Sequence, residues 1–364
     1  MFYAAVFFAL PVLAAASYLY VTGLERATGL TYGVPLALAL LGAGTVEGGR
    51  RLGLMDTEIW NGRITQKTHG SMGCCHCRNE CDTCTRTDDK GRTETYACRC
   101  HEVCDHTVDY RWDLRVSTGD TVPVKTCEAS SSLEPVAWTK AYVGEPASVE
   151  HPYTNYLLAD PASVYRQSAA HEVSLPTTMY PRVSGLYRVD HVVGTWPVSA
   201  RTALETAMDE LDADLGAKKQ VNVLLYGVTG SASATEAAQA LTLAWLYGKK
   251  NDLIVVVQHD NATVQSADLV TISRVGELRS HLQADLPGLA LPELPDTVRG
   301  LVATHFTRTP MAEWAYLEGQ AEPPIWALVV ASLLLVGGGV VYVVQDAFRS
   351  KDFFSRLSWS KPRF

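Results

Sequence analysis

The sequence predicts a membrane-anchored α+β protein, with a small cysteine-stapled antiparallel β module, a following α/β sandwich, and N-terminal and C-terminal transmembrane helices. Three observations predict this class. Long apolar runs without charge lie at both ends of the chain. Eight of the nine cysteines lie between positions 74 and 104. Beyond residue 199, the hydrophobic period changes from the value of a strand to that of a helix.

The composition limits the function classes. The 364 residues include 31 Lys and Arg against 39 Asp and Glu, a formal net charge of −8. Binding to nucleic acid needs clustered basic residues for phosphate contacts, so we expect no nucleic-acid partner. An apolar share of 47% is too high for a disordered chain. At about 150 residues per domain, this length predicts two folded units plus extra segments.

The first membrane region is predicted over residues 1–48, with helices at about 2–22 and 30–46. Both runs are rich in apolar residues, and the first carries no charge. A cleaved signal peptide is the alternative for 2–22, because Ala14, Ala15 and Ala16 offer a small-residue cleavage site. The basic segment that begins such peptides is missing, so we favour a membrane helix.

A third membrane helix is predicted at 325–344, followed by a basic tail at 345–364. At a rise of 1.5 Å per residue, this uncharged run is long enough to cross a hydrocarbon core of about 30 Å. Lys and Arg near membrane ends favour the cytoplasmic side. We therefore expect a multi-pass protein of the cytoplasmic membrane, with its tail inside and its soluble region outside. Arg50 and Arg51 favour the opposite topology.

The cysteine cluster predicts a covalent or metal staple. A disulfide framework is one interpretation, because segments with too little core often need it. Nine is an odd number, so at least one thiol would remain outside intramolecular disulfides. The cysteines are Cys74, Cys75, Cys77, Cys81, Cys84, Cys98, Cys100, Cys104 and Cys127.

Zinc is the second interpretation of this cluster. The spacing of Cys74 with Cys77, and of Cys81 with Cys84, lets two thiolates converge on one ion. The site would be completed by further ligands from the second arm or by nearby histidines, which are Cys98, Cys100, Cys104, His76, His101 or His106. An external location favours disulfides and a cytosolic one favours zinc. A redox-active dithiol at Cys81 and Cys84 is a third interpretation.

The cysteine-rich β module is predicted over residues 54–190. Residues 108–117 alternate between apolar and polar side chains, as in a half-buried strand, with Asp109 and Asp113 on the charged face. A charged turn, DDKGR, separates the two thiol-rich arms and predicts a hairpin. Asn61 and Gly62 signal a tight turn or a bulge. Further short runs lie at 122–126, 138–143 and 153–158.

The α/β domain is predicted over residues 192–319. A helix from Ser199 is followed by a buried strand at 221–228, and the spacing of Ser233 and Glu236 predicts a capping box that opens a helix ending at Trp245. Strands alternating with helices favour an α/β sandwich. The remaining elements are predicted as strands at 253–257 and 268–273 and helices at 275–282 and 294–303.

One motif in this domain is distinctive. The helix that ends at Trp245 runs through LYGKKN into Asp252, the strand LIVVV, and then His259 and Asp260. With the strand VNVLLYGV and the segment LVATHFTRTPM, these residues resemble the TPM domain family. The resemblance covers residues 192–319. The front portion, with DTEIWNGRITQK, CDTC and YRWDL, resembles uncharacterised membrane proteins of tailed bacteriophages.

The TPM resemblance implies a membrane-tethered, extracytoplasmic domain. Phosphatase activity is proposed for some members of the family and scaffold roles for others. The resemblance makes Asp252 and Asp260 candidate catalytic residues that would hold a divalent cation. Asp also commonly caps turns at strand ends, and we favour that interpretation.

The function predicted from the sequence is non-enzymatic. We expect a membrane-anchored protein of phage origin, in a bacterial host, that presents a two-module soluble region to a protein partner. The alternatives are a cation-dependent phosphatase of TPM type and a zinc-binding membrane-associated module. The expected partners are the lipid bilayer and a protein.

Overall fold

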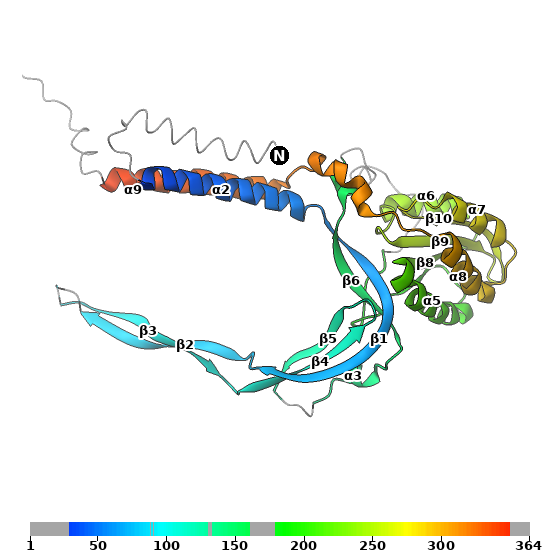
Figure 1. The fold of residues 1–364 in the computed structure, drawn as a ribbon, viewed down its shortest axis with the longest axis horizontal. Coiled ribbons are helices and arrows are strands. Elements are labelled where there is room, and N and C mark those ends of the chain that lie inside the picture. The colour runs from blue at the N-terminus through cyan, green and yellow to red at the C-terminus, as the bar shows by residue number, and fades with distance from the viewer. Residues whose placement is uncertain (1–28, 88, 90, 130–132, 161–178, 350–364) are drawn as a thin grey trace, which may run out of the picture. The chain divides into compact units, whose positions relative to one another are not determined.

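A computed structural model describes residues 29–87, 89, 91–129, 133–160 and 179–349, with backbone alone for 29–35 and 339–349 (Figure 1). The predicted helix at 2–22 and most of the basic tail lie outside these residues. The chain divides into two compact units. The first comprises 1–56, 152–171 and 310–364, and the second comprises 57–151 and 172–309. The predicted β module and α/β domain contribute most of their residues to the second unit.

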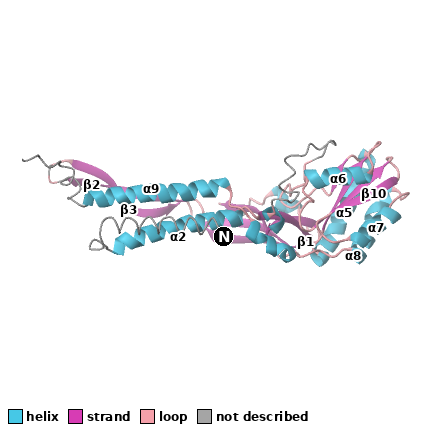
Figure 2. Ribbon diagram, turned by 90° about the horizontal axis from the view of Figure 1, so that it is seen from above, coloured by secondary structure: helices cyan, strands magenta, loops and turns pink. Residues whose placement is uncertain are grey.

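The first unit contains two helices that lie side by side, α2 (Gly29–Leu52) and α9 (Ile325–Arg349) (Figures 1 and 2). Glycines allow the close approach. A Cβ atom added at Gly49 would come within 2.4 Å of the Ala327 Cβ, and one at Gly338 within 2.6 Å of the Leu38 side chain. The order of these contacts makes the pair antiparallel. Small residues serve the same purpose between membrane helices.

Within the described part of residues 29–349, no single helix meets both the length and the hydropathy of a crossing segment. Met311–Gln320 (η5) and Ile325–Gly338 meet them together, but the axis bends by 47° between them. The spans predicted at 30–46 and 325–344 therefore stay predictions.

The first unit also contains the short helix η2 (Tyr156–Ala159), which packs against η5. The buried residues of this contact are Leu54, Ala159, Leu317 and Ala321. At the end of α2, the Arg50 side chain forms ion pairs with Glu47 at 2.7 Å and Glu318 at 3.1 Å. Arg50 thereby ties α2 to η5.

The second unit begins with a four-stranded antiparallel sheet in the order β5-β4-β1-β6. The alternating run is confirmed as a strand, because Trp112, Leu114 and Val116 are buried. The charged face was predicted wrongly, since Asp109 and Asp113 are buried as well. The strands are β1 (Met55–Gly73), β4 (Val108–Val116), β5 (Thr121–Glu128) and β6 (Pro146–Thr154).

Asn61 and Gly62 do not form a turn, because β1 continues through both residues without interruption. The Asn61 side chain is buried, where its amide donates to Asn222 at 2.8 Å and its carbonyl accepts from the Ser148 hydroxyl at 2.6 Å. Tertiary hydrogen bonds therefore override the local turn preference. The run at 138–143 also differs, because it begins in a short helix, α3 (Val136–Lys140).

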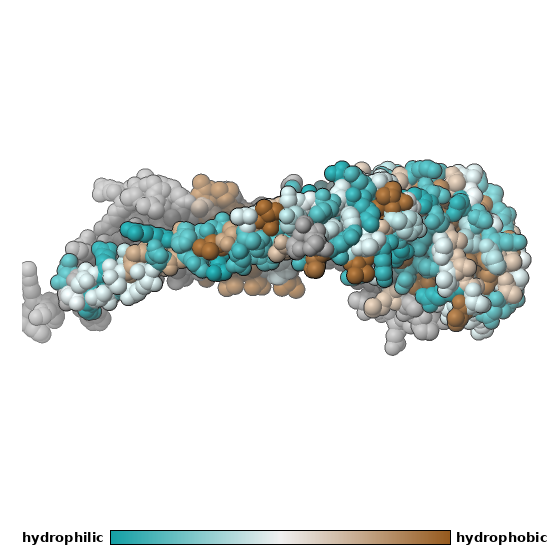
Figure 3. Space-filling model, turned by 90° about the horizontal axis from the view of Figure 1, so that it is seen from below, coloured by the Kyte–Doolittle hydropathy of each residue, from teal (hydrophilic) through white to brown (hydrophobic). Residues whose placement is uncertain are grey.

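The predicted hairpin is confirmed as a two-stranded ribbon of β2 (Cys77–Thr87) and β3 (Thr93–Cys104). Almost all of its residues are exposed, and the face shown in Figure 3 is largely hydrophilic. An isolated two-stranded ribbon is only marginally stable in water, so this one needs another source of stability.

The α/β domain has a four-stranded sheet in the order β10-β9-β8-β7. Strands β7, β8 and β9 are parallel, and β10 is antiparallel to β9. Successive side chains of β8 and β9 enter two separate cores, so helices cover both faces. The strands are β7 (Val192–Gly194), β8 (Asn222–Val228), β9 (Asp252–His259) and β10 (Val264–Val270).

The helices divide unequally between the two faces of this sheet. Among the described helices, three pack on one face and one packs on the other. The predicted capping box is confirmed, because Ser233 accepts from the Glu236 N–H and Glu236 accepts from the Ser233 N–H. The helices are α5 (Val198–Lys219), α7 (Gly276–Asp285) and α8 (Leu294–His305) on one face and α6 (Ala234–Ala244) on the other.

Candidate functional site

All nine cysteines lie in the described part of the chain, and eight of them pair in disulfides. Three disulfides join β2 to β3 along the ribbon, and the fourth ties the turn after β1 to β5. Cys74 is the remaining thiol. The pairs are Cys77 with Cys104, Cys81 with Cys100, Cys84 with Cys98, and Cys75 with Cys127.

This pairing decides between the interpretations of the cysteine spacing. Cys81 and Cys84 are bonded to the opposite strand, so they form neither a zinc pair nor a dithiol with each other. His101 lies in the middle of β3 opposite Glu80, and its side chain is exposed. Zinc ligation by paired Cys-x2-Cys motifs is therefore not what the structure shows.

A different set of donors meets where the sheet passes into the ribbon. Cys74 and His76 lie in the turn between β1 and β2, His106 lies in the turn between β3 and β4, and Asp109 is the second residue of β4. One donor atom from each of these four residues lies within 4.8 Å of the others. Such a group could hold a metal ion.

Asp109 is the centre of this group. Its side chain has no exposed surface, and one oxygen accepts from the Cys75 N–H at 2.6 Å. The same oxygen faces His76 Nδ1 at 3.3 Å, and the other faces His106 Nε2 at 2.5 Å. Burial alone would raise the pKa of Asp109, but the Cys75 N–H and His106 outweigh it and hold that pKa below its usual value.

Three members of this group, Cys74, His76 and His106, were predicted as candidate ligands from the sequence, whereas Asp109 was not. The alternating pattern assigned Asp109 to a solvated face, whereas β4 buries it beneath the junction. One signal could have found it. A histidine and an aspartate three residues apart follow the second cysteine arm, opposite the Cys74 and His76 pair that precedes the first.

Asp252, a candidate from the TPM resemblance, is buried at the start of β9. Its carboxylate accepts from the Asn222 amide at 2.8 Å, the Tyr180 hydroxyl at 2.7 Å and the Lys249 N–H at 2.7 Å. Burial raises the pKa of Asp252 to about 6 despite these bonds. Asp252 is engaged as a structural acceptor.

Asp260 lies just beyond the other end of β9, in an exposed turn. Its carboxylate accepts from the Ala262 and Thr263 N–H groups at 3.0 and 2.8 Å, as in an Asx turn. At a rise of about 3.3 Å per residue, an eight-residue strand holds Asp252 and Asp260 more than about 20 Å apart. The structure does not bring these two carboxylates together.

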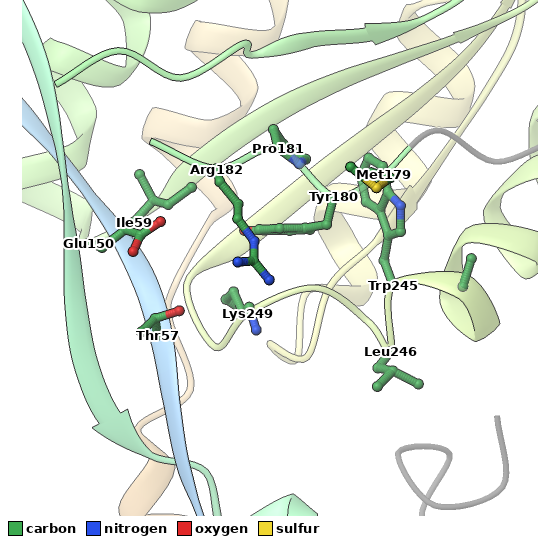
Figure 4. Close-up of a pocket in the computed structure, with 11 residues that line it drawn as sticks. Thr57, Ile59, Glu150, Met179, Tyr180, Pro181, Arg182, Trp245, Leu246 and Lys249 are labelled. Atoms are coloured by element: carbon green, nitrogen blue, oxygen red, sulfur yellow. The ribbon is translucent and has the colours of Figure 1, made fainter. Parts of the chain in front are cut away.

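A pocket of about 740 Å³ lies beside the turn between α6 and β9 (Figure 4). The residues Leu246, Tyr247 and Gly248 have φ of 53°, 64° and 75°, and this left-handed turn brings the Lys249 N–H onto Asp252. The lining residues are Thr57, Ile59, Glu150, Met179, Tyr180, Pro181, Arg182, Ala244, Trp245, Leu246 and Lys249.

Two further groups contain donors that could meet at a metal. His191 lies with Glu205 and Asp209, and Glu277 lies with His281 and His305. In the first group, Glu205 already accepts from the N–H groups of His191 and Val192, which ties α5 to the start of β7. In the second group, the donors lie on the surfaces of α7 and α8. The rings of His281 and His305 stack there with their centroids 4.3 Å apart.

Comparisons of the chain with protein-family models, curated proteins and solved structures found no match.

Proposed function

We propose that the chain is a membrane-anchored, non-enzymatic protein that presents its β module and α/β domain to a protein partner outside the cytoplasmic membrane. The main support for this proposal is the structure of the ribbon formed by β2 and β3. It exposes nearly all of its residues, and three disulfides span it. Structural disulfides persist in oxidising compartments and are rare in the cytosol. The disulfides therefore favour the external topology.

The helix pair supports the membrane anchor. Leu40 and Leu41 on α2 are each 57% exposed, and Leu333 and Val336 on α9 are 68% and 67% exposed. Large apolar side chains in this number on a helix pair favour a surrounding apolar phase. The bend before α9 does not prevent insertion, because membrane helices tolerate kinks.

The ion pairs of Arg50 weaken the opposing topology. Its guanidinium is engaged with Glu47 and Glu318, so this charge is partly compensated within the protein. Arg51 is then the main basic residue that favours a cytosolic soluble region, and it also forms an ion pair with Glu47 at 3.0 Å. The basic tail remains the stronger signal.

The resemblance to the TPM family and the phage origin belong to this proposal. Two features are consistent with the resemblance: a mostly parallel sheet with helices on both faces, and a helix that ends at a tryptophan before a glycine-lysine turn. The hydrogen bonds of Asp252 and Asp260 to groups of the chain itself support a structural role for both carboxylates over a catalytic one. We expect the wild-type chain and the Asp252→Asn, Asp260→Asn double variant to show equal background hydrolysis of a phosphomonoester with Mg²⁺ or Mn²⁺. Hydrolysis that the wild type performs and a correctly folded double variant does not would establish the phosphatase instead.

Topology is tested by protease accessibility in bacterial spheroplasts. An epitope tag is inserted after Gly91, in the turn of the ribbon, and a matched tag follows Phe364 in a second version of the chain. We expect external protease to remove the ribbon tag and to spare the C-terminal tag until the membrane is lysed. Loss of the C-terminal tag with protection of the ribbon tag would overturn the proposal.

A further inference from the structure

At the junction between the sheet and the ribbon, the antiparallel pairing of the strands is interrupted. The last pair of β1 and β4 is Gly73 with Val108, and the first pair of β2 and β3 is Cys77 with Cys104. Three residues on each side separate these pairs. One backbone hydrogen bond crosses the gap, from the Asp105 N–H to the His76 carbonyl at 3.3 Å. The backbone alone therefore holds the junction weakly.

The side chains at this break are metal donors of three kinds. Cys74 offers a thiolate, His76 and His106 offer imidazole nitrogens, and Asp109 offers a carboxylate. Both imidazoles turn a ring nitrogen toward the carboxylate, so a cation in this space would face all of them. A buried carboxylate, two imidazoles and a thiol therefore converge on one point, and together they form a complete set of four metal ligands.

The distances suit a small tetrahedral ion. Zinc binds sulfur at about 2.3 Å and nitrogen or oxygen at about 2.0–2.2 Å, so ligand atoms around it lie about 3.3–3.8 Å apart. The four donors already lie within 4.8 Å of one another. Side-chain shifts of about 1 Å would complete the tetrahedron. Ca²⁺ and Mg²⁺ prefer oxygen ligands alone, so a mixed sulfur, nitrogen and oxygen set favours zinc.

We propose that Cys74, His76, His106 and Asp109 bind one Zn²⁺ ion that closes the break between the sheet and the ribbon. The ion joins the two turns, which are adjacent in the fold but 30 residues apart in sequence. The zinc ion also coordinates the sulfur of Cys74. This Sγ lies within 4.8 Å of the sulfurs of Cys77 and Cys104, which form a disulfide. Coordination lowers the reactivity of that thiolate towards the neighbouring disulfide. All four ligands come from one chain, so the site needs no partner protein.

Zinc binding is tested on the full chain, purified in mild detergent, stripped with a chelator and exchanged into chelator-free buffer. We expect one zinc per chain by elemental analysis after addition of Zn²⁺ and removal of the excess. Co²⁺ in place of Zn²⁺ should give a thiolate-to-cobalt charge-transfer band. Cys74→Ser should abolish that band. Zinc well below one per chain, or an unchanged band in Cys74→Ser, would overturn the proposal.

The ligand set is tested with matched histidine variants. His76→Gln should weaken zinc binding at least about 10–100-fold, the loss measured for groups that support metal ligands. The control is His101→Gln, which alters an exposed histidine on the same ribbon and should leave the affinity unchanged. Equal losses in both variants would contradict the site. Since Asp109 is buried and its variant can fail to fold, the decision rests on the half-exposed His76, with the four disulfides of each variant verified by mass spectrometry.

Discussion

Asp252 links the two sheets of the second unit through buried hydrogen bonds. Ser148 donates to Asn61, Asn61 donates to Asn222, and Asn222 donates to Asp252. On its other side, Asp252 accepts from Tyr180. A network of this kind stabilises only if each polar group keeps its partner.

Replacing Asp252 with Asn should lower the free energy of unfolding by about 1–3 kcal/mol, because an amide group would face buried donors. Asp260→Asn is the control, because its side chain is exposed and an amide oxygen can still cap the turn. Urea unfolding followed by tryptophan fluorescence measures both. Equal stability of Asp252→Asn and the wild type would contradict the structural role of this carboxylate.

His191 predicts a pH dependence of stability. Burial alone would lower its pKa, but Asp212, Asp209 and Glu205 raise the pKa of His191 to about 9. A group whose pKa is raised on folding stabilises the fold fully below its unfolded value of about 6.5. That contribution is lost as the pH rises through 9. The unfolding free energy should therefore fall between pH 6.5 and 9, and His191→Gln should remove most of this slope. A wild-type profile that is flat over this range would show that His191 is neutral in the fold.

At the scale of elements, the turn after α6 depends on Gly248. Its φ is 75°, and an added Cβ would come within 2.6 Å of the Asp252 carboxylate. Gly248→Ala should therefore destabilise the domain by about 2 kcal/mol or more, from left-handed backbone and the clash together. Gly276→Ala is the control, since no atom lies within 4 Å of its added Cβ. Thermal unfolding distinguishes the two, and equal melting temperatures would contradict the account of this turn.

The pairing of α2 with α9 depends on Gly49. Leucine at this position would overlap Ala327, whereas leucine at Gly44 on the same helix meets nothing within 4 Å of its Cβ. Gly49→Leu should cost about 1–3 kcal/mol or separate the helices, as overpacking does elsewhere. Limited proteolysis in detergent should cut Gly49→Leu faster than Gly44→Leu. Identical digestion of both would show that these helices do not pack through their glycines.

Features that depend on local contacts could be predicted from the sequence, and features that depend on distant contacts could not. The capping box at Ser233 was predictable, because both of its hydrogen bonds are local. The strand at 108–116 was predictable from its alternation, but the burial of Asp109 was not. That burial depends on turns that lie far away in the sequence. The prediction of a turn at Asn61 was wrong for the same reason, because the hydrogen-bond partners of Asn61 are the distant residues Ser148 and Asn222.

At the scale of the whole molecule, the sequence predicted a staple without its connectivity. Spacing alone allows many pairings of nine cysteines. The register of β2 and β3 selects among them, because it places Cys77 opposite Cys104 and Cys81 opposite Cys100. The same register leaves Cys74 outside the ribbon, beside two histidines. The candidate metal centre therefore follows from strand pairing, which no local pattern reveals.

The central claim is that the soluble region lies in an oxidising compartment, where eight cysteines form disulfides and a single thiol remains. The most direct test is to purify the full chain in mild detergent, denature it without reductant in the presence of a chelator, alkylate it and measure its mass. We predict one alkyl group per chain, located by peptide mapping at Cys74. Alkylation of most of the nine cysteines would contradict the disulfide framework and place the soluble region in the cytosol.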